Sequence, residues 1–141
     1  MHRSFLIAAI GLAIVSTPQA ADAPKIVPLL TQPLADLPNK EALMLTVAYG
    51  PGESSPAHRH NADVFVYVLE GAILMGVNGG APVRLEAGQT FHESPSDVHT
   101  VSRNASDSAP AKFVVFIVKN KGAPATAPTG SASPTTSTAW R

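Results

Sequence analysis

Residues 41–118 alternate short apolar runs with clusters of turn-forming residues. The runs are rich in Val, Leu, Ile and Phe, and Gly, Pro, Asn and Ser separate them at intervals typical of an all-β sandwich or barrel. Asn78, Gly79 and Gly80 accept positive φ angles and predict a hairpin turn. The region shows no helical repeat. The pattern therefore predicts strands at residues 42–49, 63–69, 72–77, 83–86, 90–94, 98–102 and 111–118.

The last predicted strand is apolar at every position from 113 to 118, so neither of its faces is suited to water. One face would pack into the core of the barrel. We expect the other face to pack against a second subunit, which predicts a homodimer. The alternative is a cover formed by the N-terminal segment 26–30.

The N-terminus has the order of a secretory signal: His2 and Arg3 precede an apolar run at residues 5–15, and small residues follow at 16–21. The apolar run is too short to cross a bilayer as a helix. A membrane anchor and a buried first helix are the alternatives. We predict a cleaved signal peptide at residues 1–21, export to a periplasm, and no stable membrane anchor.

Composition changes after Val118 to a run of Ala, Pro, Thr, Ser and Gly, which has too little apolar surface to offset the entropy of ordering it. We expect a disordered tail at residues 119–141, which leaves one compact domain at residues 25–118. The chain has no cysteine, so disulfides are excluded. Its formal charge is balanced and it has no basic stripe with interleaved aromatic residues, which argues against a nucleic-acid partner.

Three of the five histidines form a candidate metal site. His58 and His60 are one residue apart, so on an extended chain both imidazoles project from the same side. His99, from a later strand, can complete a site that leaves coordination positions for a small molecule. The alternatives are exposed loop histidines for the pair and a core histidine bonded to the backbone for His99.

The three histidines lie in two motifs that resemble those of the cupin superfamily. The first motif has a glycine, five residues, His-x-His and a later glycine, and the second has a proline before a histidine and then an asparagine. The resemblance implies a cupin-type jelly-roll β-barrel with a metal held inside it. The matching residues are Gly52, His58, His60 and Gly71 in the first motif and Pro95, His99 and Asn104 in the second.

The first motif departs from the family where it expects a glutamate. Val64 stands at the shorter spacing and Phe65 at the longer one, and neither side chain can bind a cation. The ordinary carboxylate ligand is therefore missing. The identity of the divalent metal stays open among Fe, Mn, Ni and Zn, with iron favoured.

Glu93 is the residue that could replace the missing carboxylate, and it is the candidate catalytic residue. On the predicted strand it shares a face with Phe91, which is the expected interior face, so His92 faces outward. A buried carboxylate is costly unless it is paired or bound to a cation. Glu93 should therefore bind the metal, hold a metal-bound water as a base, or pair with Arg103, which has the strand parity of His99.

All-histidine cupin sites resemble those of iron-dependent dioxygenases that cleave diketones or oxidise thiols. The resemblance thus implies that the three histidines hold Fe(II) and that a small-molecule substrate binds in the open positions, beside a dry wall of Val64, Val66 and Val68. The alternative function is a non-catalytic periplasmic module that binds a metal or a small ligand.

Overall fold

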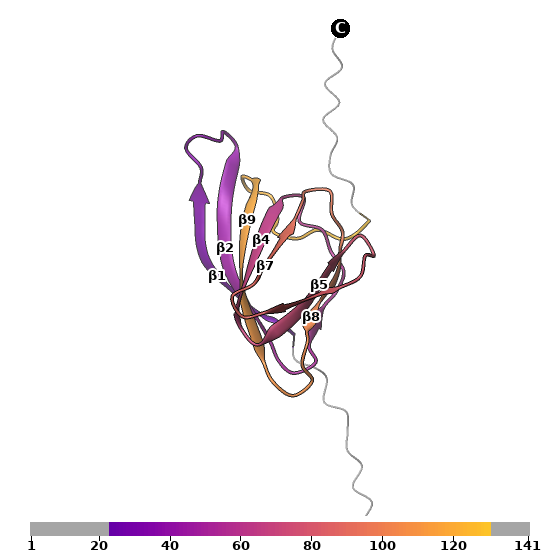
Figure 1. Cartoon of the computed structure of the whole chain (residues 1–141). Coiled ribbons are helices and arrows are strands. Elements are labelled where there is room, and N and C mark those ends of the chain that lie inside the picture. Colours follow the sequence, from indigo (N-terminus) through magenta and orange to yellow (C-terminus); the bar gives the residue numbers. More distant parts are fainter. Residues whose placement is uncertain (1–22, 131–141) are drawn as a thin grey trace, which may run out of the picture.

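The computed structural model describes residues 23–130, and in this range the protein is all-β. The predicted signal peptide lies outside the described residues. The described residues form nine strands in two antiparallel sheets, which face one another across the core (Figure 1). The prediction of an all-β jelly-roll fold is confirmed. Within residues 23–130, no helix is long and apolar enough to cross a membrane.

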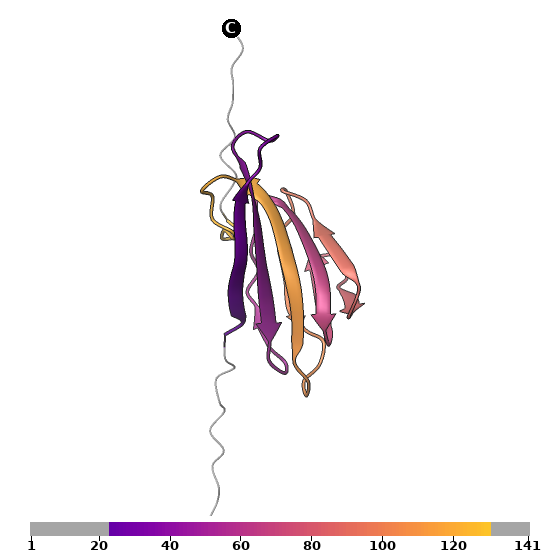
Figure 2. The ribbon, with the colours of Figure 1, turned by 90° about the vertical axis from the view of Figure 1, so that its left-hand side faces the viewer.

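The larger sheet has the strand order β1-β2-β9-β4-β7 and can be followed from edge to edge in Figure 2. Its central strand β9 pairs with β2 on one side and with β4 on the other. The edge strand β1 was not predicted. The bounds are β1 (Lys25–Pro33), β2 (Lys40–Tyr49), β9 (Ala111–Asn120), β4 (Asp63–Glu70) and β7 (Thr90–Glu93).

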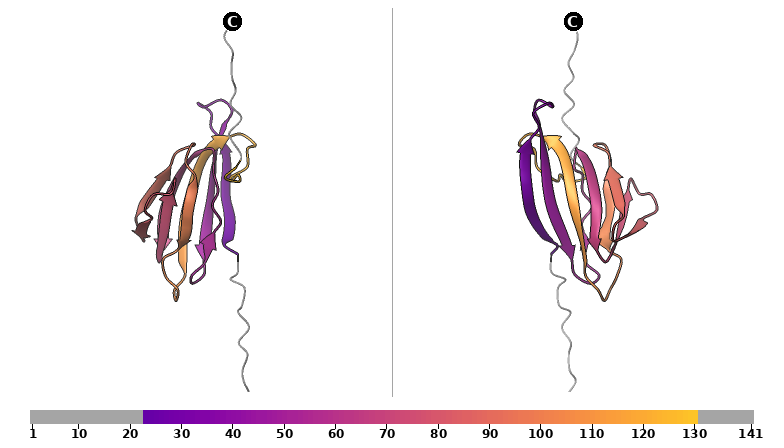
Figure 3. Two further views of the ribbon diagram at one scale, coloured as in Figure 1. Left: turned by 90° about the vertical axis from the view of Figure 1, so that its right-hand side faces the viewer. Right: turned by 60° about the vertical axis from the view of Figure 1, so that its left-hand side comes forward.

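The smaller sheet has the strand order β3-β8-β5-β6, and Figure 3 shows it beside the larger sheet from two sides. The hairpin between β5 and β6 turns at Asn78 and Gly79, whose φ angles are 55° and 72°. This confirms the predicted hairpin turn. The bounds are β3 (Ser54–Ser55), β8 (His99–Asn104), β5 (Ala72–Val77) and β6 (Val83–Glu86).

The core lies between the sheets, because every second side chain of the central strands points inward. Val64, Val66 and Val68 of β4 are at most 3% exposed, and each pairs with an inward residue of β9. Ile73 and Met75 of β5 close the core from the other sheet. Burial of one such side chain contributes roughly 1.5–3 kcal/mol. The barrel therefore has an apolar core that does not depend on a metal.

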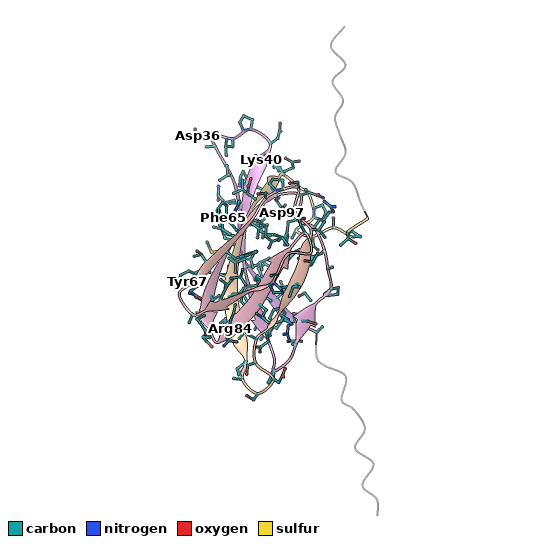
Figure 4. The ribbon with its side chains drawn as sticks, turned by 45° about the vertical axis from the view of Figure 1, so that its right-hand side comes forward. Asp36, Lys40, Phe65, Tyr67, Arg84 and Asp97 are labelled. Carbon is teal, nitrogen blue, oxygen red and sulfur yellow. The ribbon has the colours of Figure 1, made fainter. Side chains whose placement is uncertain are left out.

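The outer face of the larger sheet is also apolar. Val114 and Phe116 of β9 point outward and are half-buried. Phe65 and Tyr67 of β4 pair with them and are 46% and 48% exposed, on the outside of the sheet (Figure 4). The N-terminal segment does not cover this face, because it pairs edge to edge with β2 as β1. The homodimer stays a prediction.

The folded domain continues beyond Val118, where the sequence predicted that a disordered tail begins. β9 continues to Asn120. The ammonium of Lys119 forms a buried ion pair with Glu41 and donates to the carbonyl of Ala123 at 2.7 Å, and the amide of Gly122 donates to Glu41 at 3.1 Å. The Lys119 partner lowers the pKa of Glu41. These contacts hold the start of the expected tail against the barrel, and residues 131–141 lie outside the described range.

Gly71 of the first motif occupies a corner where a side chain has no room. Its φ angle is 68°, and a Cβ built there would lie 2.5 Å from the carbonyl oxygen of Pro110 and 3.0 Å from Cα of Ala111. Gly79 has a similar φ angle of 72°, yet nothing lies within 4 Å of its Cβ position. The first glycine is therefore required by conformation and by close approach, and the second by conformation alone.

We expect Gly71→Ala to destabilise the protein more than Gly79→Ala. A left-handed conformation costs a non-glycine residue about 1–2 kcal/mol in both variants, and Gly71→Ala adds a clash with backbone atoms that cannot move independently. Chemical unfolding of the two variants measures the difference. Equal losses would mean that the corner between β4 and β5 yields without cost.

Candidate metal centre

The structure brings the three predicted histidines together at one end of the barrel. His58 and His60 follow β3, and His99 begins β8. The backbones of His58 and His99 exchange two hydrogen bonds, at 3.1 Å and 2.9 Å, which fixes the two residues side by side. One ring nitrogen from each of the three histidines lies within 4.8 Å of the others.

A β-bulge in β8 determines which of its side chains face the barrel interior. Val77 of β5 lies opposite His99, but the next residue, Gly76, lies opposite Val101, so Thr100 is an extra residue in the ladder. The bulge turns both His99 and Ser102 inward, and both are buried.

The same bulge turns Arg103 outward. Arg103 is exposed and pairs across to β3. The predicted alternative in which Arg103 forms an ion pair with Glu93 is therefore wrong, because strict strand alternation does not hold through the bulge.

Backbone carbonyls set the tautomers of His58 and His60. Nδ1 of His58 lies 2.8 Å from the carbonyl oxygen of Pro56, and Nδ1 of His60 lies 2.7 Å from that of Ala125. A carbonyl oxygen only accepts, so each Nδ1 carries a proton and each neutral ring presents a bare Nε2. These two Nε2 atoms lie 3.1 Å apart.

Two lone pairs that face each other at this distance repel unless a positive charge lies near both. Protonation of His60 does not provide that charge at neutral pH, because burial, with a smaller effect from His58, lowers the pKa of His60 to about 4. Burial and the neighbouring His58 and His60 likewise lower the pKa of His99 to about 4, and its Nε2 is buried without a hydrogen-bond partner. His60 and His99 thus offer neutral ring nitrogens that a cation can bind.

The spacing of the His58 and His60 nitrogens fits a metal ion. Two imidazole nitrogens that each lie about 2.1 Å from one ion are separated by about 3.0–3.4 Å, and the observed separation of the His58 and His60 Nε2 atoms is 3.1 Å. Neutral imidazole is a good ligand for divalent iron, nickel, copper and zinc. The three-histidine cluster is therefore suited to a divalent metal, and its donor atoms do not distinguish among these ions.

Glu93 lies directly across the sheet from the vacant position of the motif. In the pairing of β4 with β7, the partner of Val64 is Glu93. Adjacent strands lie only about 4.8 Å apart, so a carboxylate on β7 can reach the space that a longer side chain at Val64 would enter. Glu93 points inward and is 2% exposed, whereas His92 is exposed and lies 3.4 Å from Asp63.

The Glu93 carboxylate lies against the histidines without a well-formed hydrogen bond. Its Oε1 atom is 3.2 Å from Nδ1 of His99 but is not aligned for a hydrogen bond, and its Oε2 atom is 4.0 Å from Nε2 of His60. Burial, followed by the charge of Asp97, raises the pKa of Glu93 to about 7. A cation at the cluster would favour the ionised carboxylate, so Glu93 is placed to compensate part of its charge.

Residues 123–130 form a strap over this end of the barrel, which crosses from the larger sheet toward the smaller one (Figure 1). The carbonyl of Ala125 accepts from His60, and the backbones of Arg59 and Ala127 exchange hydrogen bonds at 2.9 Å and 2.7 Å. The Arg59 side chain donates to the carbonyl of Thr129 at 3.1 Å. The strap was missed from the sequence, because its contacts to the site use backbone atoms that every residue has.

The cluster opens into a cavity of about 390 Å³ between the sheets. Its walls are mainly aliphatic and aromatic, and Ala125 and Thr126 of the strap line its edge. Tyr49, Ser55 and Ser102 also line it, and none of these three was predicted as a site residue. A small molecule that reached the histidines would lie mostly against apolar side chains.

Solved structures with similar folds include enzymes of different kinds and an uncharacterized protein. An uncharacterized protein with a double-stranded β-helix domain from Klebsiella pneumoniae is 19% identical, with a TM-score of 0.61, over 77% of this chain and 86% of that chain. The DMSP lyase DddQ from Ruegeria pomeroyi is 22% identical, with a TM-score of 0.54, over 62% of this chain and 43% of that chain.

Oxalate oxidase in complex with glycolate is 23% identical, with a TM-score of 0.57, over 80% of this chain and 57% of that chain. At these identities the similarity shows the fold alone. The chain spans less than half the length of the DMSP lyase that it resembles.

In a comparison with curated proteins, none matches this chain. The family model described as a cupin domain matches residues 45–117. The match runs from β2 to β9 and includes His58, His60, Glu93 and His99. The protein therefore belongs to the cupin family.

Proposed function

We propose that the protein is a metal-dependent oxidoreductase of the dioxygenase type, in which His58, His60 and His99 hold Fe(II) and a small molecule binds in the adjoining cavity. The observation that supports this most is the pair of bare Nε2 atoms 3.1 Å apart beside the unpartnered Nε2 of His99. When bound, ferrous iron supplies the redox chemistry that dioxygen requires. The proposal is also supported by the similar fold of oxalate oxidase, which is named as an enzyme that oxidises a small molecule.

In this proposal Glu93 has two roles. Its carboxylate balances part of the metal charge, and as a buried base beside His99 it can accept a proton from a bound small molecule. The apolar wall formed by Val64 and Val66 limits water around this group, which strengthens electrostatic interactions at the site. The strap carbonyl at Ala125 orients His60 in the way that outer hydrogen bonds orient metal ligands.

A second candidate is a non-catalytic module that binds a metal or a small ligand. The observation that favours it is the strap, which is hydrogen-bonded to His60 and Arg59 and lines the cavity with Ala125 and Thr126. Both candidates are exported proteins in our proposal, with a periplasmic location and a homodimer formed through the outer face of the larger sheet. Neither binds nucleic acid.

Replacement of His99 by Ala should abolish stoichiometric metal binding and leave the β-fold intact, because the apolar core is separate from the cluster. Inductively coupled plasma analysis of metal-loaded protein measures the first effect and circular dichroism the second. His92→Ala is the matched control, since His92 is an exposed histidine on the outer face, and it should retain full metal.

Dioxygen uptake that requires His58, His60 and His99 would select the enzyme, and bound metal without turnover would select the binding module.

Replacement of Glu93 by Gln should weaken metal binding roughly tenfold to a hundredfold, as changes beside metal ligands do. In the metal-free protein, the same substitution should increase the stability of the fold. The raised pKa of Glu93 means that the folded state holds a proton longer than the unfolded state, so its contribution to stability is lost as pH rises from about 4.5 through about 7. Gln cannot ionise, so metal-free Glu93→Gln should gain stability over the wild type between about pH 5 and pH 8.

Calorimetric metal titration and thermal unfolding of the metal-free protein measure these two effects. Glu70→Gln is the control, because Glu70 is exposed in the same sheet, and it should change neither. An unaltered metal affinity in Glu93→Gln would remove Glu93 from the site.

Truncation after Pro124 should weaken metal binding by roughly tenfold or more, because it removes the Ala125 carbonyl that holds the proton of His60 on Nδ1. Truncation after Gly130 leaves the strap in place and should have no effect. The same calorimetric titration compares the two. Equal affinity in both truncated proteins would show that the strap does not position His60.

A further inference from the structure

Two pairs of side chains line the cavity from the same ladder of strands. The residues opposite each other are Ser55 and Ser102 in one rung, and His58 and His99 in another. The two rungs are three positions apart on each chain, which corresponds to about 10 Å along a fully extended strand. Because the bulge at Thr100 restores the inward direction, Ser102 and His99 both face the cavity. The cavity thus has a histidine end and a hydroxyl end.

The hydroxyl end is a small hydrogen-bonded group. The phenol oxygen of Tyr49 lies 2.7 Å from Oγ of Ser55 and 2.7 Å from Oγ of Ser102. Three hydroxyl groups carry three protons, and the two bonds between them use two of these. The third proton can go to the carbonyl oxygen of Ser102, which lies 3.4 Å from the phenol oxygen, or to a ligand that offers a closer acceptor. Burial raises the pKa of Tyr49, which keeps the phenol neutral.

Positive charge is absent from this cavity. Within residues 23–130, no Lys or Arg side chain lines it. The cations nearest in sequence to its lining have other partners or face away. Arg59 donates to the carbonyls of Thr129 and Ser96, and Lys119 pairs with Glu41. Lys25 and Arg103 are exposed, and Lys112 lies on the outer face of β9. An anionic group at the hydroxyl end would therefore be buried without a countercharge, which is costly.

The space between the two ends is apolar. Val47, Val66, Met75, Phe113 and Val115 line it from both sheets. These walls favour a ligand body without polar groups, and the cavity volume of about 390 Å³ lies near the lower limit for small-molecule sites. The one carboxylate of the cavity, Glu93, lies at the histidine end.

We propose that the cavity selects a small elongated ligand with three parts. A chelating group with at most one negative charge lies at the histidines, an apolar body spans the cavity, and an uncharged hydrogen-bond acceptor meets the hydroxyl group of Tyr49, Ser55 and Ser102. Dicarboxylates, which carry a charge at both ends, are excluded. The chelating end is assigned from the proposed metal site. The apolar body and the uncharged acceptor are assigned from the cavity alone.

Three matched probes test this inference: benzohydroxamic acid and its para-methoxy and para-carboxy derivatives. All three chelate a metal through the same group and differ only at the far end of the ring. We expect the para-carboxy compound to bind at least about tenfold more weakly than the para-methoxy compound, because its charge is unpaired. The para-methoxy compound should bind roughly twofold to tenfold more tightly than the parent, as one hydrogen bond allows. Calorimetric titration measures all three affinities.

Ser102→Ala should reduce the advantage of the para-methoxy compound over the parent, because it removes one of the hydroxyls that can present the free proton. Ser55→Ala provides a second variant should the first fail to fold. Ser54→Ala is the matched control, because Ser54 lies on the same strand and is exposed. It should leave the order of affinities unchanged.

The titration is carried out on iron-loaded and on metal-free protein, so that failures can be assigned. The order of the three probes comes from the cavity and should hold in both forms, with weaker binding in the metal-free form. An order that holds with no difference between the two forms would overturn the metal site and support the cavity assignment. A para-carboxy compound that binds as tightly as the para-methoxy compound, or a para-methoxy advantage unaffected by Ser102→Ala and Ser55→Ala, would overturn the inference, as would a failure of all three probes to bind.

Discussion

Two unprotonated imidazole nitrogens face each other at 3.1 Å, and much of this end of the barrel holds them there. The carbonyls of Pro56 and Ala125 fix the protons on the far side of both rings. The bridge between His58 and His99 and the bulge in β8 bring the third ring to the same place. Such an arrangement is unfavourable for neutral rings alone and favourable around a cation, because each lone pair then meets positive charge.

Val64 stands where the family motif expects a glutamate, and the register of the sheet places Glu93 directly opposite it. Val64 itself fills the core at this position. A carboxylate can thus enter nearly the same space from the adjacent strand, although the sequence separation between the two positions is large. The change also brings Glu93 within 3.2 Å of His99, which gives the carboxylate a close contact with a candidate ligand as well as with the centre.

Strand alternation predicted the inward direction of Glu93 and the outward direction of His92, because β7 is regular. It failed for Arg103, because the sequence carries no clear sign of the extra residue at Thr100. The strap was unpredictable for a different reason. It has no large apolar side chain, and it is held by the Lys119 ion pair and by hydrogen bonds of its backbone, neither of which produces a hydrophobic pattern. The edge strand β1 contains two prolines, which also weakened its signal.

The most direct test of the account is an anomalous diffraction experiment on crystals of the full folded domain grown with ferrous iron under anaerobic conditions. The account predicts one peak per chain, about 2.0–2.2 Å from an imidazole nitrogen of each of His58, His60 and His99, with the Glu93 carboxylate beside it. A peak elsewhere on the protein, or histidines that keep their positions with no metal among them at stoichiometric iron, would contradict it.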